Sequence, residues 1–151
     1  MLHLSDEGIM LRVQVNRGLD GKFQKLENML NGYRDLYLSE MASQLVLYSP
    51  VDTGTYITGH HIKTTAVGAS RSSEGKPRQQ PYEQFAQDAL NELSVEISQL
   101  PEAATQVVFS NDTFHSDEVE YEHGYAPYRK TAREHSRAAA KAAAEAKARN
   151  T

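Results

Sequence analysis

The sequence predicts an α+β domain in which a small, mostly antiparallel sheet is flanked by a long N-terminal helix, a second helix and a C-terminal helix. Three patterns support this prediction. Apolar residues alternate with other residues near the N-terminus, as in a half-buried strand. Over residues 20–48 they recur at steps of three and four, as in an amphipathic helix. Near the C-terminus the chain is rich in alanine, lysine and arginine, which favour helix.

The N-terminal half is expected to contain a strand and a long helix. Every second position over residues 9–15 is aliphatic, which predicts the strand. Asp20 is a suitable N-cap for the helix at residues 20–48. The apolar stripe of this helix consists of Phe23, Leu26, Leu30, Tyr33, Tyr37, Met41 and Leu45.

A sharp corner is expected to end this helix. Pro50 has no backbone N–H and disfavours helix at the preceding Ser49. Asp52 and Thr53 can hydrogen-bond to their own backbone in a turn, and Gly54 tolerates a positive φ. The predicted structural corner is formed by Pro50, Val51, Asp52, Thr53 and Gly54.

Four further elements are expected after the corner. Alternation predicts a strand at 60–67, and helical spacing predicts a helix at 82–100. A strand is expected to begin at Val107, and alternating Glu and apolar residues predict another at 118–122. Residues 68–81 are expected to form a mobile loop. Residues 1–128 are then expected to make one domain, and residues 129–151 a basic helical extension. The C-terminal helix itself is expected to start at Pro127, just before this boundary.

Charge is unevenly distributed along the chain, although the net charge is only −4. Residues 74–122 contain 2 basic and 11 acidic side chains, whereas residues 123–151 contain 7 basic and 2 acidic ones. This separation predicts either internal docking or head-to-tail contact between copies. The chain has no cysteine, which excludes disulfides and thiolate chemistry. It also has no apolar run long enough to span a membrane, so no membrane partner is expected.

No constellation of side chains predicts catalysis, a metal site or a cofactor. His60 and His61 are adjacent, so on a strand they point to opposite faces and cannot both bind one metal. Neither a nucleophile elbow nor a glycine-rich phosphate loop is present. The carboxylates and histidines of residues 115–123 leave an enzyme as one alternative. The expected role of the acidic strand is instead a solvated face that lines a lumen or an interface, formed by Glu118, Glu120, Glu122 and Gly124.

A basic stripe on the C-terminal helix leaves a second alternative, a soluble DNA-binding or regulatory module. Its residues are Arg129, Lys130, Arg133, Arg137 and Lys141. Such a stripe can contact phosphates, but no aromatic residue follows Tyr128 within it, so base stacking is not predicted. Docking to a protein partner is the other role that fits this stripe.

Two motifs give the chain a resemblance to a known family. Pro-Val-Asp-Thr-Gly at residues 50–54 ends a helix and precedes a strand, and Glu122-His123-Gly124 lies near the C-terminus. This arrangement resembles the tail-completion (neck, head–tail joining) proteins of tailed bacteriophages. The chain departs from that family in having Asp117-Glu118 where Tyr-Ala is expected, and a helix at 82–100 in place of a hairpin region.

The resemblance implies a non-enzymatic virion protein with a fold like that of tail terminators. Such a protein is made in the host bacterial cytoplasm and assembles as a ring, usually a hexamer, in the neck or tail of the virion. Its implied partners are further copies of itself, adjacent head-completion or connector proteins, and tail-terminator or tail-tube proteins. Genome DNA is expected to pass through the ring without specific binding.

Overall fold

A four-stranded antiparallel sheet forms one side of the molecule, within the residues that the structure describes. The computed structural model describes the backbone of residues 2–5, 8–14 and 24–31, and backbone with side chains for residues 32–51, 54–68, 80–102, 104, 106–114, 116–122 and 124–149. The strands are β1 (Leu2–Ser5), β2 (Gly8–Gln14), β3 (His60–Lys63) and β4 (Gln106–Asn111). Their order in the sheet is β1-β2-β4-β3, so the late strand β4 lies between the N-terminal hairpin and β3.

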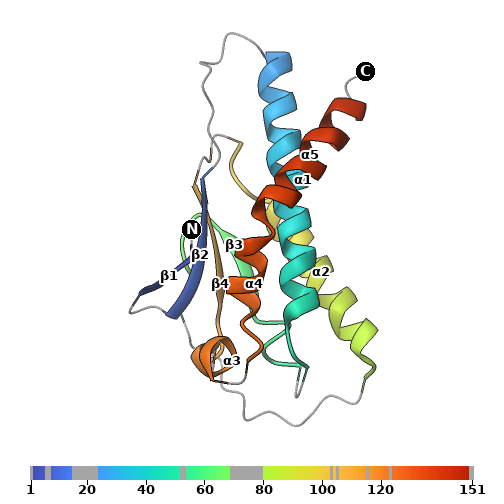
Figure 1. Ribbon diagram of the computed structural model, residues 1–151. Coiled ribbons are helices and arrows are strands. Elements are labelled where there is room, and N and C mark those ends of the chain that lie inside the picture. The colour runs from blue at the N-terminus through green and yellow to red at the C-terminus, as the bar shows by residue number, and fades with distance from the viewer. Residues whose placement is uncertain are drawn as a thin grey trace.

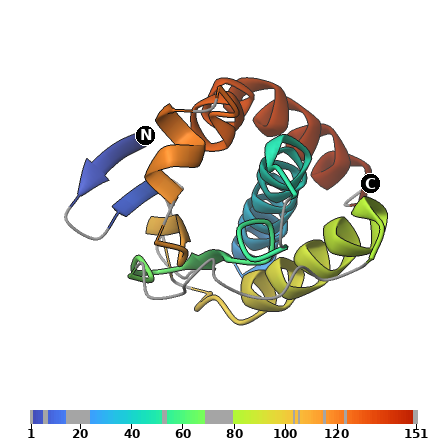
Figure 2. The ribbon, with the colours of Figure 1, turned by 90° about the horizontal axis from the view of Figure 1, so that it is seen from below.

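The helices gather around one long central helix. This is α1 (Gln24–Tyr48), and the others are α2 (Tyr82–Ser98), α3 (Ser116–Tyr121), α4 (Pro127–Arg133) and α5 (His135–Arg149). Figures 1 and 2 show α1 beside the sheet, with α2 on one flank and α4 and α5 on the other. The sequence expectation of an α+β fold with a small antiparallel sheet and three flanking helices is confirmed.

The core lies where α1, α2 and the sheet meet. Leu38, Met41 and Leu45 repeat at steps of three and four on α1 and are buried. On α2, Phe85, Ala89, Leu93 and Ile97 form the matching stripe. The sheet contributes Ile62 and Phe109, and α4 contributes Tyr128. Burying an aliphatic or aromatic side chain of this size stabilises the fold by about 1.5–3 kcal/mol, so these stripes fix how the helices pack.

Most predicted elements exist close to their expected places. The strand predicted at residues 9–15 corresponds to β2, the long helix ends at Tyr48 as predicted, and the helix predicted at 82–100 corresponds to α2. The expected strand at 60–67 ends at Lys63, because the chain then leaves the sheet and the Val67 N–H bonds to Ser110 Oγ at 3.0 Å. The predicted mobile loop at residues 68–81 lies mostly outside the described residues, which omit residues 69–79.

The expected strand at 118–122 is wrong, because these residues belong to helix α3 and its C-terminal end. Glu-Val-Glu-Tyr-Glu alternates as a strand does, but Ser116, Val119 and Glu120 also fit the helical steps of three and four. Those three are the residues that α3 buries. Glu118, Glu120 and Glu122 therefore do not share a face: Glu120 is buried, while Glu118 and Glu122 lie four residues apart on the exposed side.

The C-terminal helix consists of two helices rather than one. Glu134 separates α4 from α5, and the proposed domain boundary after Tyr128 falls inside α4. Ala138, Ala142 and Ala146 are buried, and α5 packs along α1. Small side chains allow this close approach, so α5 is ordered against its own chain.

Candidate functional site

The predicted corner is a tightly packed turn after α1. Gly54 has a φ of +84°, as the turn prediction requires. A Cβ atom at this position would lie 2.2 Å from Phe85 Cε1, so only glycine lets α2 approach this closely. The Thr58 hydroxyl and its N–H both donate to the Gly54 carbonyl. Pro50 and Val51 are half-buried, with Val51 packed against the core, and Asp52 and Thr53 lie outside the described residues.

A buried polar network connects this corner to β3 and α4. His60 Nε2 lies 2.8 Å from Ser49 Oγ, and His60 Nδ1 lies 3.0 Å from the Tyr128 hydroxyl. Asn111 Nδ2 also approaches Nδ1 at 3.1 Å and donates to the Tyr56 carbonyl. All of the side-chain groups in the network are at least 95% buried. The network therefore ties the end of α1 to β3, β4 and α4 through side chains that are far apart in the sequence.

The Ser49–His60 pair has the distance of a catalytic dyad but the wrong proton arrangement. The Ser49 hydroxyl donates to the Leu45 carbonyl at 2.6 Å, so its oxygen accepts from His60 Nε2–H. Nδ1 then accepts from Tyr128 and Asn111. Burial, and then the neighbouring His61, lower the pKa of His60 to about 3, which keeps the ring neutral. With its acceptor nitrogen facing Tyr128, His60 does not activate Ser49, and the pair holds the fold together.

His61 faces away from His60 and lies between two carboxylates. Its Nε2 is 2.8 Å from Asp112 Oδ2 and its Nδ1 is 3.0 Å from Glu96 Oε2. Hydrogen bonds to Asp112 and Glu96 raise the pKa of His61 to about 9, so it is charged at neutral pH. The expectation that the two histidines point to opposite faces of the strand is confirmed, because each has its own set of partners.

Glu96 also closes the free edge of β3. Its Oε1 accepts the Ile62 N–H at 3.0 Å, while Oε2 pairs with Lys63 at 3.1 Å as well as with His61. Burial raises the pKa of Glu96, but the hydrogen bonds from His61, Ile62 and Lys63 outweigh it and lower the pKa overall. A carboxylate that occupies an outward N–H blocks strand addition at that edge. The β3 edge is therefore a poor docking surface for another strand.

Glu120 performs a structural task that its sequence context did not reveal. Its carboxylate accepts the backbone N–H groups of Tyr128 at 3.0 Å and Arg129 at 2.8 Å, at the start of α4. Ala126 occupies the N-cap position with a φ of +43° and has no capping side chain. Glu120 supplies the missing cap from α3 and also pairs with the Arg129 side chain at 3.2 Å. Its complete burial excludes the lumen role expected for it.

Most of the predicted basic stripe is occupied by contacts within the chain. Arg129 pairs with Glu120, and Lys130 approaches the Gly124 carbonyl and lies 5.8 Å from the Tyr48 ring centre. Arg137 Nη1 is 3.6 Å from Glu134, and Lys141 Nζ is 2.9 Å from Glu40. Within the described residues, Arg133 is exposed without an ion pair. The stripe is thus partly neutralised, although Arg137 and Lys141 keep 83% and 58% of their side-chain surface exposed.

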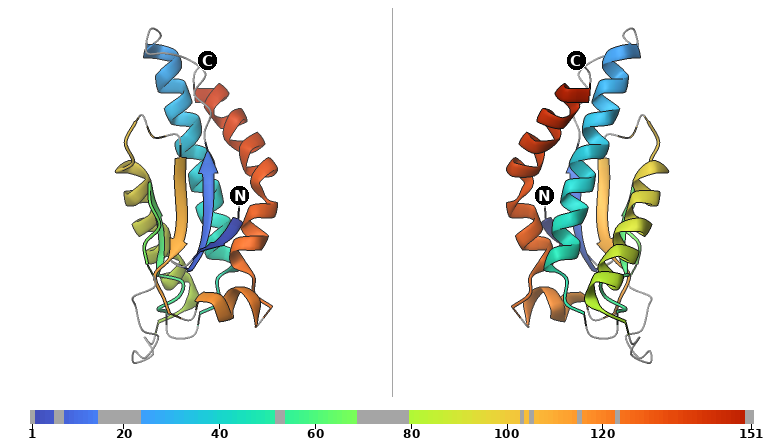
Figure 3. Two further views of the ribbon diagram at one scale, coloured as in Figure 1. Left: turned by 90° about the vertical axis from the view of Figure 1, so that its left-hand side faces the viewer. Right: turned by 90° about the vertical axis from the view of Figure 1, so that its right-hand side faces the viewer.

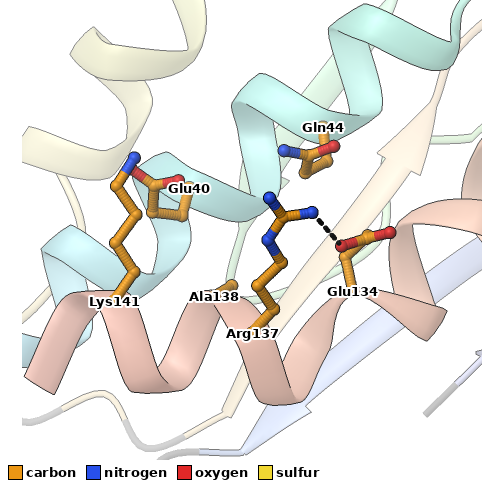
Figure 4. Close-up of a pocket in the computed structure, with 6 residues that line it drawn as sticks. All are labelled: Glu40, Gln44, Glu134, Arg137, Ala138 and Lys141. Atoms are coloured by element: carbon orange, nitrogen blue, oxygen red, sulfur yellow. Dashed lines mark ion pairs between the residues drawn. The ribbon is translucent and has the colours of Figure 1, made fainter.

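A small polar cavity of about 90 Å³ lies between α1 and α5. Figure 4 shows Lys141 reaching Glu40 on α1, and Arg137 directed toward Glu134 and Gln44. A groove of about 270 Å³ lies between the end of β3 and the C-terminal end of α2. Sites for small molecules usually measure about 300–1,000 Å³ and are mostly apolar, so neither space is typical of one.

Arg34 is a second structural residue that the sequence patterns did not reveal. It lies on α1 with 2% of its surface exposed, and its Nη1 donates to the Pro101 carbonyl at 2.8 Å. The Glu102 and Ala104 carbonyls lie within 3.4 Å of the same nitrogen. Arg34 thereby holds the turn between α2 and β4. No spacing signal links a helix residue to carbonyls 67 positions away.

Within the described residues, no group of three or more side chains is arranged to hold a metal ion. His115 and His123 lie outside that part of the chain, and the structure describes the four carboxylates of residues 115–123, which are Asp117, Glu118, Glu120 and Glu122. None of the described helices has the length and apolar character needed to cross a membrane. Comparison with protein-family models, curated proteins and solved structures found no match for this chain.

Proposed function

We propose that this chain is a structural protein of a tailed-bacteriophage virion that assembles into a ring, a hexamer, at the junction of head and tail. The ring joins the capsid connector to the tail and lets DNA pass. The observation that carries this proposal is the corner at residues 50–54, on which the family resemblance rests. It ends α1, places Gly54 against Phe85 and leads into β3, so the motif has a specific architectural role.

The arrangement of polar groups supports a structural role over a catalytic one. The described histidine and carboxylate clusters serve as internal connections: His60 ties the corner to α4, Glu96 closes β3, and Glu120 caps α4. Each is saturated by partners of its own chain. A protein that must withstand assembly forces benefits from such connections between elements, whereas a catalytic group needs an open position for a substrate.

The proposed partners are further copies of this chain, head-completion or connector proteins on one side, and tail-terminator or tail-tube proteins on the other. The proposed location is the virion neck or tail, after synthesis in the bacterial cytoplasm. Genome DNA is expected to slide past without tight binding. The internal pairing of Arg129, Arg137 and Lys141 supports weak rather than tight contact with phosphates.

Imaging of the purified full-length protein tests this proposal most directly. Negative-stain electron microscopy and native mass spectrometry are expected to show a ring with a central opening and a mass near six chains. A monomer at every accessible concentration would contradict the proposal. Titration with labelled duplex DNA at low and moderate salt distinguishes the virion ring from the alternative, a DNA-binding module. Tight, strongly salt-dependent binding by a monomer would favour the DNA-binding module.

A further inference from the structure

Exposed aromatic side chains lie at both ends of α3: Phe114 precedes the helix, Tyr121 ends it, and Tyr125 lies in the turn toward α4. Phe114, Tyr121 and Tyr125 are 64%, 44% and 46% exposed. Asp117, Glu118 and Glu122 are also exposed, and with Tyr121 they are spaced by three and four residues, so these four lie on one side of α3 and its C-terminal end. We call these six residues the elbow surface. Among the described residues, the other large exposed apolar side chains are Leu47, Tyr82 and Val95, which lie on α1 and α2.

The elbow surface is held in a fixed shape. Glu120 caps α4, and the Ala126 N–H donates to the Val119 carbonyl at 3.3 Å. Ala126 is in the left-handed region, which disfavours residues with a Cβ atom, so the surrounding contacts must maintain this turn. The Arg129 guanidinium lies 4.7 Å from the centre of the Tyr121 ring. Aromatic side chains held rigidly in water are typical of protein docking surfaces, because little entropy is lost when they are covered.

The charge of the elbow surface specifies the chemistry of its partner. Asp117, Glu118 and Glu122 have no ion pair within the part of the chain that the structure describes. Arginine and lysine satisfy both features of this surface, since they pair with carboxylates and stack on aromatic rings. Arg129 already makes both kinds of contact in this region, with Glu120 and with Tyr121.

The chain itself presents such a partner along α4 and α5. Arg137 and Lys141 lie four residues apart on the flank of α5 that borders the cavity against α1, and Arg133 precedes Arg137 by four residues on α4. All three side chains are exposed to solvent, although Arg137 pairs with Glu134 and Lys141 with Glu40. We call these three residues the basic face. Figure 3 shows that α5 runs away from α3 toward the opposite end of the molecule. With the elbow fixed, one copy cannot bring its elbow surface onto its own α5.

We propose that the elbow surface of one copy docks onto the basic face of a second copy of this chain. The two surfaces differ, so the contact is head-to-tail, and its repetition produces a closed ring when the rotation between copies allows closure. This inference rests on the self-assembly in the proposed function and adds the surfaces that make it. The closed β3 edge agrees with an interface made by side chains rather than by strand addition at β3.

Charge reversal on each surface tests the contact. Glu118→Lys with Glu122→Lys, and separately Arg133→Glu with Arg137→Glu, are each expected to weaken self-association at least about tenfold, because like charges then face each other. Mixed in equal amounts, the two variants are expected to assemble again, since every basic elbow can meet an acidic α5 face and every acidic elbow a basic one. Sedimentation velocity over a concentration series measures all three samples.

Matched variants control for charge and for loss of exposed apolar surface. Glu83→Lys with Glu92→Lys makes the same charge change on the exposed side of α2 and is expected to leave association unchanged. Phe114→Ser with Tyr125→Ser is expected to weaken association, whereas Leu47→Ser is not. Circular dichroism and thermal unfolding of each variant confirm that it remains folded.

The outcomes separate this inference from the proposed function. Wild-type rings together with unimpaired association of the Glu118→Lys, Glu122→Lys variant would overturn the elbow contact and leave the ring proposal standing. Failure of the mixed variants to associate would likewise overturn the contact. A wild-type monomer at every concentration would overturn both. Loss of duplex binding by the Arg133→Glu, Arg137→Glu variant with normal association would show that the basic face serves nucleic acid, and would overturn the contact.

Discussion

At the scale of single residues, the glycines at positions 54 and 32 have opposite effects on stability. Gly54 has a positive φ and lies directly against the Phe85 ring, so both its backbone angle and its missing side chain are required. Gly32 lies inside α1, where an added Cβ atom would meet nothing within 4 Å. Gly32 therefore weakens its helix without a packing reason that the described residues provide.

Replacing these glycines with alanine is expected to change stability in opposite directions. Gly54→Ala should lower the free energy of unfolding by about 2–4 kcal/mol, from left-handed strain and displacement of the Phe85 ring. Gly32→Ala should raise it by about 0.5–1 kcal/mol, because alanine loses less backbone entropy in a helix. Urea unfolding of both variants beside the wild type measures the two changes. Equal stability of Gly54→Ala and wild type would contradict the packing role of the corner.

At the scale of elements, the pairing of α1 with α5 depends on small side chains. Ala142 is completely buried and Ala138 is 4% exposed on the side of α5 that meets α1. A long helix of alanines gains little stability alone, so this contact explains why α5 is ordered. Removing α5 to test its role in assembly would also uncover α1, which makes substitutions on its outer side the cleaner experiment.

A larger residue at Ala142 is expected to separate the two helices. Ala142→Leu should lower the free energy of unfolding by about 1–3 kcal/mol, because the space against α1 holds only a methyl group. Ala143→Leu places the same side chain one position further on, on the exposed side, and should change stability by less than about 0.5 kcal/mol. Thermal unfolding compares the pair. Equal destabilisation by both would indicate that leucine disturbs the helix itself rather than its packing.

At the scale of the whole molecule, the adjacent histidines make stability depend on pH in opposite senses. The pKa of His60 is about 3 in the folded chain and near 6.5 when unfolded, so the unfolded state takes up a proton first as pH falls below 6.5. His61 has a folded pKa of about 9, so the unfolded state loses its proton first as pH rises above 6.5. These two groups together place the stability maximum near pH 6.5.

Single substitutions are expected to remove one side of this profile at a time. Between pH 6.5 and 5.5, above the ordinary Glu pKa of about 4.3, stability should fall with a slope of up to about 1.4 kcal/mol per pH unit, and His60→Gln should flatten this decline. His61→Gln should flatten the decline between pH 6.5 and 9. Chemical denaturation at half-unit pH intervals gives both profiles. A profile unchanged by either substitution would show that other groups set the pH dependence.

The sequence by itself determined the features that depend on near neighbours in the chain. Steps of three and four fix the buried stripes of α1 and α2, and Pro50 with Gly54 fixes the end of α1 and the turn after it. Adjacent histidines on a strand must face opposite ways, so the placement of His60 and His61 on opposite faces followed from local geometry alone. In each case the chain spacing alone settles which side chains can share a face.

The tertiary structure decided the features that depend on distant partners. The segment 116–121 fits a strand and a short helix equally well, and it became α3 because Val119 and Glu120 must face inward while Glu120 caps α4. His60 meets Tyr128 across 68 positions, and Arg34 meets Pro101 across 67. A buried carboxylate or guanidinium is tolerated only where hydrogen-bonding or charged partners surround it. No local sequence pattern indicates which distant partners the folded chain will bring to it.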